Sequence, residues 1–216
     1  MTENLEPICF DAMRARIVPA SVATTWTEAL PALTGHRLTL RELVPTDSLA
    51  LLSMLSTAEV AKFISPPPTT EQGFQKFITW THTERQAGRQ ITFGMVPEGC
   101  DQAVGLVQVR SIAPNFSTAE WGFALGSPFW GTGLFLASAR MTLDFAFQNT
   151  EVNRLEARAV VQNGRGNGAM RKLGAGQEGI LRGSLLKDGK HLDQIMWSIL
   201  RQDWYQAKAV WSAVVH

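Results

Sequence analysis

The sequence predicts an α+β (α/β) domain with a mixed, mostly antiparallel sheet of about six to seven strands flanked by helices. Strand-like stretches occur as neighbouring pairs joined by short turns, which is typical of antiparallel hairpins. An apolar helix pattern at 132–148 separates strand patterns at 119–125 and 153–161, so these two strands should run parallel. The 216 residues suffice for one full core, and we place that domain at 35–216, after an N-terminal extension at 1–34.

The first half of this domain should contain one strand followed by three helices. A half-buried strand is expected at 36–44, and a first helix follows Pro45. A short helix at 57–64 should stop at the three prolines 66–68. A longer helix then runs from about 70 to 86, where its apolar residues follow the helical period.

The second half is dominated by strands. We expect them at 90–96, 103–112, 119–125, 153–161, 177–186 and 191–200. Asp188-Gly189 is the strongest hairpin signal in the chain. A short helix between the strands at 153–161 and 177–186 should end at Leu173, with Gly174 as its left-handed stop. The tail from Arg201 reads as a final helical turn or two.

The stretch 119–148 organises the rest, because it reads as a strand, a glycine turn and a helix. The turn contains Gly126, Gly131 and Gly133, and the helix begins directly after them. Such a turn aims backbone N–H groups and the positive end of a helix dipole at one point. That point is a site for a phosphate group.

The composition favours some classes of protein and argues against others. Apolar residues make up 45% and charged residues 18%, as in ordinary soluble proteins, and the net charge of +1 shows no basic stripe for nucleic acid. No apolar run suits a signal peptide or a membrane span, so we expect a cytoplasmic protein with Cys9 and Cys100 as free thiols. His36, His82 and His191 form no constellation, and we predict no metal.

Four stretches together resemble the GNAT N-acetyltransferases, in the branch of ribosomal-protein N-terminal acetyltransferases. They are HRLTLREL with Asp47, AEWGFALGSPFWGTG, NRLEARAVVQNGRGNGAMRKLGA, and GILRGSLLKDGKHLDQIMWSIL with Asp203 and Trp204. The resemblance runs from about His36 to Trp204 and rests on the common order and spacing of these motifs. It implies the GNAT fold, acetyl-CoA as the cofactor, and acetyl transfer to a primary amine by direct attack in a ternary complex.

The resemblance also implies where the cofactor binds. The pantetheine arm should lie between the strands at 119–125 and 153–161, and the pyrophosphate should meet backbone amides of the glycine turn. The cofactor-binding candidates are Phe123, Ala124, Leu125, Trp130, Gly131, Thr132, Gly133, Leu134, Phe135, Asn163 and Arg165. The chain departs from the family pattern at Phe135, which replaces a small residue, and at Gly166, which replaces a serine. Its one tyrosine, Tyr205, lies in the wrong segment for the acid catalysis of many members.

Glu120 and Asn163 are the candidate catalytic residues. A carboxylate beside the gap can accept the proton of the attacking amine, although Glu120 could equally order loops or bind the amine. Glu156 and Asp193 are alternatives, with a solvated charge and a structural hydrogen bond as their plainer roles. Asn163 could hold pantetheine or a water, or cap a helix. Arg165 could pair with a phosphate of the cofactor or simply be exposed.

The acceptor and the assembly stay open. The acceptor wall should come from about 57–86 and 180–195, but no motif there tells a peptide N-terminus from a small-molecule amine. We expect a monomer or a homodimer. A non-catalytic regulatory protein that binds acyl-CoA is the alternative function. A dinucleotide-binding oxidoreductase is disfavoured because Leu136 stands where its motif needs glycine.

Overall fold

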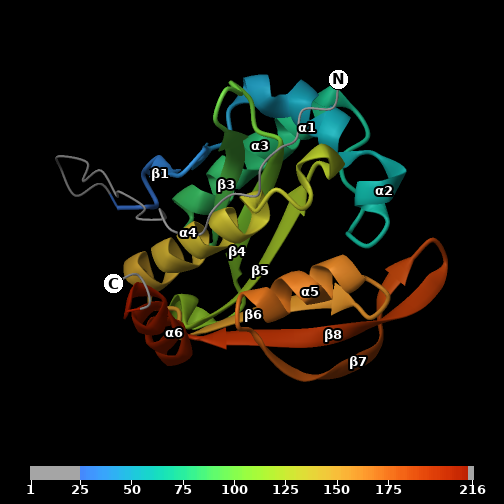
Figure 1. Cartoon of the computed structure of the whole chain (residues 1–216). Helices are drawn as coiled ribbons and strands as arrows, with labels where there is room; N and C mark the ends of the chain where they lie inside the picture. The colour runs from blue at the N-terminus through green and yellow to red at the C-terminus, as the bar shows by residue number, and fades with distance from the viewer. Residues whose placement is uncertain (1–24, 214–216) are drawn as a thin grey trace, which may run out of the picture.

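One mixed sheet of eight strands organises residues 25–213, the part of the chain that this computed structural model describes (Figure 1). Its order is β1-β2-β3-β4-β5-β6-β8-β7. The strands are β1 Leu33–Gly35, β2 Leu38–Glu42, β3 Gln90–Pro97, β4 Gly105–Ser111, β5 Thr118–Leu125, β6 Arg154–Val160, β7 Gly176–Lys187 and β8 Lys190–Leu200. All neighbours pair antiparallel except β5 and β6, which are parallel. The predicted mixed sheet with a central parallel crossover is therefore confirmed.

The sheet has one strand more than the seven stretches that the sequence pattern marked. The additional strand β1 is only three residues long and pairs with β2 from Leu33 onward, two residues before the predicted domain boundary. Leu30 is buried, and the ring of Trp26 meets the ring of Phe116 edge-on at 5.6 Å between centroids. The end of the predicted extension thus packs on the domain, whereas most of the extension, including Cys9, lies outside the described residues.

Helices cover both faces of the sheet. They are α1 Ser48–Leu55, α2 Ala58–Ala61, α3 Glu71–Gln86, α4 Leu134–Asn149, α5 Gly164–Lys172 and α6 Arg201–Ala213. In Figure 1, β6, β7 and β8 form the lower half of the view with α5 and α6, below α1–α4. The helix α6 is longer than the turn or two that we expected. Its buried Trp204 donates a hydrogen bond of 2.7 Å to Asp144 of α4, which anchors α6 to the domain.

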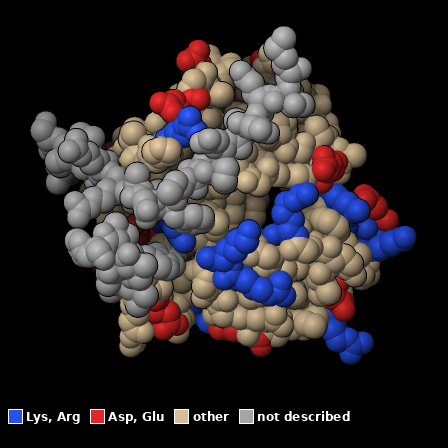
Figure 2. Space-filling view, in the orientation of Figure 1, with Lys and Arg blue, Asp and Glu red and all other residues tan. Residues whose placement is uncertain are grey.

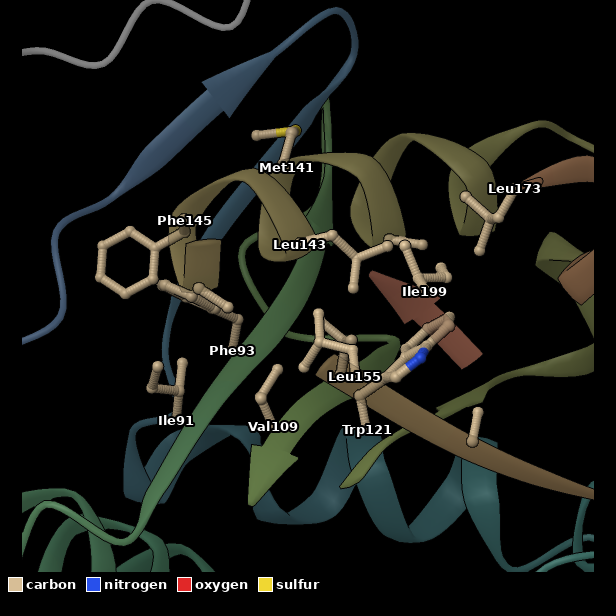
Figure 3. Close-up of a cluster of buried hydrophobic side chains, with 14 of the residues drawn as sticks. Ile91, Phe93, Val109, Trp121, Met141, Leu143, Phe145, Leu155, Leu173 and Ile199 are labelled. Atoms are coloured by element: carbon tan, nitrogen blue, oxygen red, sulfur yellow. The ribbon is translucent and has the colours of Figure 1, made fainter. Parts of the chain in front are cut away.

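Two apolar clusters fix the helices to the sheet. On one face, α4 packs on β3, β4 and β5, and the rings of Phe93 and Phe145 meet edge-on at 5.3 Å (Figure 3). On the other face, Phe74 and Ile78 of α3 pack against Leu106 of β4. The apolar pattern of 132–148 predicted a buried helix, because a helix that is apolar almost all round must be enclosed. The structure confirms this prediction.

The buried carboxylate of Asp47 connects β2, the start of α1 and the turn before β4. Asp47 is fully buried and accepts two hydrogen bonds of 2.8 Å from the Arg41 guanidinium. It also accepts from the backbone N–H groups of Val44 and Ala103. Burial alone would raise the pKa of Asp47, but these bonds outweigh it and hold that pKa below its ordinary value. The Arg41–Asp47 pair therefore fixes the start of α1 to β2 and to the turn before β4.

Candidate functional site

The strands β5 and β6 separate partway along their length. Their parallel pairing covers three residue pairs and ends where Glu120 faces Glu156. Beyond this point β5 continues to Leu125 with only β4 beside it, and β6 continues to Val160 with only β8 beside it. The stretch Trp121–Leu125 therefore presents one backbone edge to a gap in the sheet. An extended ligand can form hydrogen bonds along such an edge.

The loop after β5 brings the start of α4 to this gap. Gly131 and Gly133 have φ angles of 78° and 85°, in the left-handed region that favours glycine. The hydroxyl of Thr132 donates to the carbonyl of Phe129 and fixes the turn between them. Gly133 stands at the N-cap of α4 and offers no side chain to the first N–H groups of the helix. The N–H of Leu134 makes only a long hydrogen bond of 3.4 Å, to the Thr132 hydroxyl. The positive end of the α4 dipole therefore faces the loop.

All residues predicted for the site lie on the wall of one cavity of about 2220 Å³. They are Glu120, Phe123, Ala124, Leu125, Trp130, Gly131, Thr132, Gly133, Leu134, Phe135, Asn163 and Arg165. Ligand pockets commonly measure about 300–1,000 Å³. This cavity has room for a long cofactor and a second substrate.

Glu120 lies at the vertex where the strands separate. One of its carboxylate oxygens accepts a hydrogen bond of 2.6 Å from Arg110 of β4. The other oxygen lies 3.8 Å from Nε of Arg158 on β6. The two alternative carboxylates are outside the cavity wall. Glu156 is bound to Arg154 at 2.8 Å, and Asp193 accepts from the backbone N–H of Gly183 inside the β7–β8 hairpin, the plainer role that we considered for it.

Asn163 caps α5. Its side-chain oxygen accepts a hydrogen bond of 2.9 Å from the N–H of Gly166. A Cβ atom on Gly166 would lie 2.6 Å from Nδ2 of Asn163, so a serine at this position would displace the cap. The glycine that departs from the family pattern thus fits this particular cap. The remaining amide donors of Asn163 stay available to the cavity.

Sequence reasoning missed Asn167, which holds the end of β6 in place. This side chain is 2% exposed. It donates to the carbonyls of Val160 and Asn163, each at 3.0 Å, and accepts from the indole N–H of Trp197 at 3.0 Å. A polar residue on the inward face of a short helix was the available signal, but the surrounding glycines obscured that helix.

A stacked pair spans the two walls of the gap. The guanidinium carbon of Arg165, on α5, lies 3.6 Å from the ring centroid of Trp130, in the loop after β5. The Trp130 indole N–H donates to the carbonyl of Leu125 at 2.9 Å and so fixes the ring. Exposed basic side chains continue along α5 with Arg171 and Lys172, and Figure 2 shows lysine and arginine gathered over this region. This side of the cavity is therefore cationic.

Phe135 packs against β5. Its ring centroid lies 4.0 Å from that of Phe123, and the planes are tilted by 41°. This contact directs the ring of Phe135 towards the strand. Tyr205, in contrast, packs near Phe147 on α4 and is absent from the cavity wall of the described residues.

The segments expected for the acceptor wall line the other end of the cavity. Phe63, Phe77 and Trp80 come from the α2–α3 region, and the rings of Phe77 and Trp80 are 5.8 Å apart. The β7–β8 hairpin reaches this end through Lys187. Its ammonium donates to the carbonyls of Ala61 and Ile64 at 2.7 and 2.8 Å. No sequence pattern predicts this link, because it joins segments more than 120 residues apart.

The chain matches the family model described as "Acetyltransferase (GNAT) domain" over residues 37–176. The protein belongs to the GNAT acetyltransferase family. It is an acetyltransferase, and the dinucleotide-binding alternative falls away. The resemblance to the GNAT family predicted a gap between the strands at 119–125 and 153–161, and β5 and β6 separate at that place.

Several proteins are similar to this GNAT chain. The uncharacterized N-acetyltransferase p20 of Bacillus licheniformis is 27% identical over 78% of the chain and 96% of its own length. YdaF of Bacillus subtilis, provisionally named a ribosomal N-acetyltransferase, is 26% identical over 79% of the chain and 94% of its own length. Mycobacterium smegmatis RimJ, solved in complex with CoA-disulfide, has a TM-score of 0.71 at 19% identity, covering 80% of this chain and 88% of RimJ. At that identity the likeness concerns the fold.

Two negative findings concern the described residues only. Between residues 25 and 213, no group of three or more His, Cys, Asp or Glu side chains is arranged to hold a metal ion. Over the same part of the chain, none of the helices combines the length and apolar character needed to cross a membrane.

Proposed function

We propose that this GNAT protein transfers an acetyl group from acetyl-CoA to a primary amine, by direct attack in a ternary complex. One observation carries the proposal. The free edge of Trp121–Leu125 leads from Glu120 to the uncapped start of α4 inside one cavity. A thioester held along this edge would have a carboxylate at one end and a phosphate-binding helix start at the other.

The cofactor residues follow from this arrangement. The backbone of Phe123, Ala124 and Leu125 would bind the amide groups of the pantetheine arm. The N–H groups of the turn and first helical residues, Gly131–Phe135, would bind the pyrophosphate, where glycine permits close approach of the backbone. The stacked Arg165 would supply charge to a phosphate, since a guanidinium binds phosphate oxygens in pairs. RimJ, a structural neighbour, was solved with a CoA derivative, which agrees with this assignment.

Glu120 would accept the proton of the attacking amine, directly or through a water. The amine nitrogen then forms a bond to the thioester carbonyl carbon, and the N–H of Phe123 or Ala124 would stabilise the oxyanion. Collapse breaks the C–S bond and releases the CoA thiolate. The remaining donors of Asn163 would hold pantetheine or a water beside this centre. We propose that 35–216 forms the catalytic domain.

Calorimetry with acetyl-CoA and steady-state kinetics with an amine panel test the proposal. We expect 1:1 binding of acetyl-CoA and release of free thiol that depends on the amine. Glu120→Gln should lower kcat about 100-fold or more at pH 7, as removal of a general base does, with little change in the Kd of acetyl-CoA. Glu98→Gln is the matched control, because Glu98 is exposed and outside the cavity. Failure to bind acetyl-CoA would refute the proposal, and an unchanged kcat would remove Glu120 from the mechanism.

A further inference from the structure

Three charged side chains form the floor of the acceptor end of the cavity. Arg110, Glu120 and Arg158 come from the adjacent strands β4, β5 and β6 and line the same cavity. Arg110 and Glu120 face one another in the strand register and form a hydrogen bond of 2.6 Å. Arg158 lies 3.8 Å from the second oxygen of Glu120. One carboxylate thus lies between two guanidinium groups.

These arginines keep most of their donors free for a ligand. A guanidinium has five N–H donors, and a single hydrogen bond joins Arg110 to Glu120. The side chain of Arg110 is 56% exposed and that of Arg158 is 40% exposed, whereas Glu120 is 27% exposed. Both guanidiniums are therefore accessible from the cavity.

The charge on the cavity floor is positive because the neighbouring carboxylates form ion pairs with a different arginine, Arg154. Glu156 and Glu178 both bind Arg154, and Glu178 also accepts from the hydroxyl of Ser198. The floor is left with two guanidinium groups and one carboxylate. An acceptor that carries only ammonium charge would be repelled by this floor as its amine approached Glu120.

We infer that the acceptor is an amine with a carboxylate a few bonds from the amino group. Arg110 and Arg158 bind this carboxylate, since guanidinium groups match carboxylates in planar pairs of hydrogen bonds. The amino group then lies against Glu120, which takes its proton as the C–N bond forms and the C–S bond breaks. The aromatic wall of Phe77 and Trp80 contacts the remainder of the acceptor. This inference rests on the proposed acetyl transfer.

The carboxylate has two sources, a free amino acid or the acidic first residue of a peptide. The first experimental arm compares L-phenylalanine with phenylalaninamide. The second compares the peptides Glu-Ala-Ala-amide and Gln-Ala-Ala-amide. In the arm that represents the natural source, we expect kcat/KM to be at least tenfold higher for the charged member. Either arm supports the inference, and the arm that shows the preference identifies the source.

The variants Arg110→Gln and Arg158→Gln test the residues. Each should raise KM for the charged acceptor and bring the two members of the pair within about twofold, a loss of at least about fivefold in the preference. A variant that merely disturbed Glu120 would instead lower kcat for both members. Arg89→Gln is the control, because Arg89 forms an exposed pair with Glu84 outside this cavity. It should change neither value.

Two results overturn the inference, and they are distinguishable. Turnover of charged and neutral members at equal kcat/KM in both arms overturns the inference alone. No turnover with any amine, although acetyl-CoA binds, overturns the proposed transfer and the inference together.

Discussion

Replacement of Gly168 by alanine should stabilise the protein and weaken cofactor binding. Gly168 is interior to α5 and lines the cavity, and a Cβ atom added there meets nothing within 4 Å. Glycine inside a helix costs about 1 kcal/mol relative to alanine, and packing against the protein does not require it here. For a chain of this size, a gain of about 1 kcal/mol raises Tm by about 2–4 °C.

The same methyl group should hinder a ligand that lies across α5. Gly164 is likewise open to the cavity, and both glycines are near Arg165 in the sequence. A ligand can therefore lie close to the α5 backbone beside the Arg165 guanidinium. We expect Gly168→Ala to weaken acetyl-CoA binding by about tenfold, equivalent to about 1.4 kcal/mol. Differential scanning calorimetry of the unliganded protein and titration with acetyl-CoA measure the two effects.

Gly73→Ala provides the contrasting helix variant. A Cβ atom there would lie 3.0 Å from Cβ of Pro68 and 3.1 Å from the hydroxyl oxygen of Thr70. It should lower Tm and leave the Kd of acetyl-CoA unchanged. A rise in Tm for Gly168→Ala with an unchanged Kd would refute the reasoning that the cofactor needs this glycine. A fall in Tm would refute the reasoning from open space.

Three further predictions concern other contacts. Lys187→Met removes the link from the hairpin to the α2 region, so KM for the acceptor should rise severalfold while the Kd of acetyl-CoA stays constant. Lys190→Met on the same hairpin is the control. An unchanged KM in Lys187→Met would contradict the role of Lys187. Asp47→Asn breaks a buried ion pair and should lower the free energy of unfolding by about 3 kcal/mol in urea titrations, and a loss below about 1 kcal/mol would contradict this. Hydrogen bonds from Arg154 and Ser198 hold the pKa of Glu178 at about 2, below its ordinary 4.5, so its stabilisation is full above pH 4.5 and is lost as the pH falls towards 2. Glu178→Gln should therefore flatten the decline of Tm between pH 4.5 and 2, and an unchanged decline would exclude this contribution.

The sheet was largely predictable because its signals are local. Alternation marks β2 and β6, apolar runs bounded by turn residues mark the other long strands, and Asp188-Gly189 marks the last turn, where Asp188 and Gly189 both have positive φ angles. The strand β1 escaped prediction because three residues are too short to show a period. The length of α6 escaped it because its stability comes from Trp204 binding Asp144 of α4, a contact between distant segments.

The sequence indicated which residues would lie around one cavity, but not the side-chain contacts among them. The glycine turn and the resemblance singled out twelve residues, and the structure brings these twelve to one cavity wall because backbone geometry determines where they lie. The stacking of Arg165 on Trp130 and the cap of Asn163 on Gly166 depend on rotamers and on the approach of separate elements. Side-chain rotamers and contacts between distant elements produce no periodic pattern or residue spacing that can be recognised in the sequence.

The separation of β5 and β6 makes the cavity depend on side chains for its closure. Sheet hydrogen bonds hold the two strands only up to Glu120. Beyond that residue, Trp130 and Arg165 connect the walls at the proposed cofactor end, and Lys187 connects the hairpin to the α2 region at the proposed acceptor end. Side-chain contacts rearrange at lower cost than paired strands, so each end can adjust to its own ligand. Arg110, Glu120 and Arg158, the floor of the proposed acceptor end, lie on paired strands, so sheet hydrogen bonds hold their backbone geometry more firmly than side-chain contacts hold the two ends.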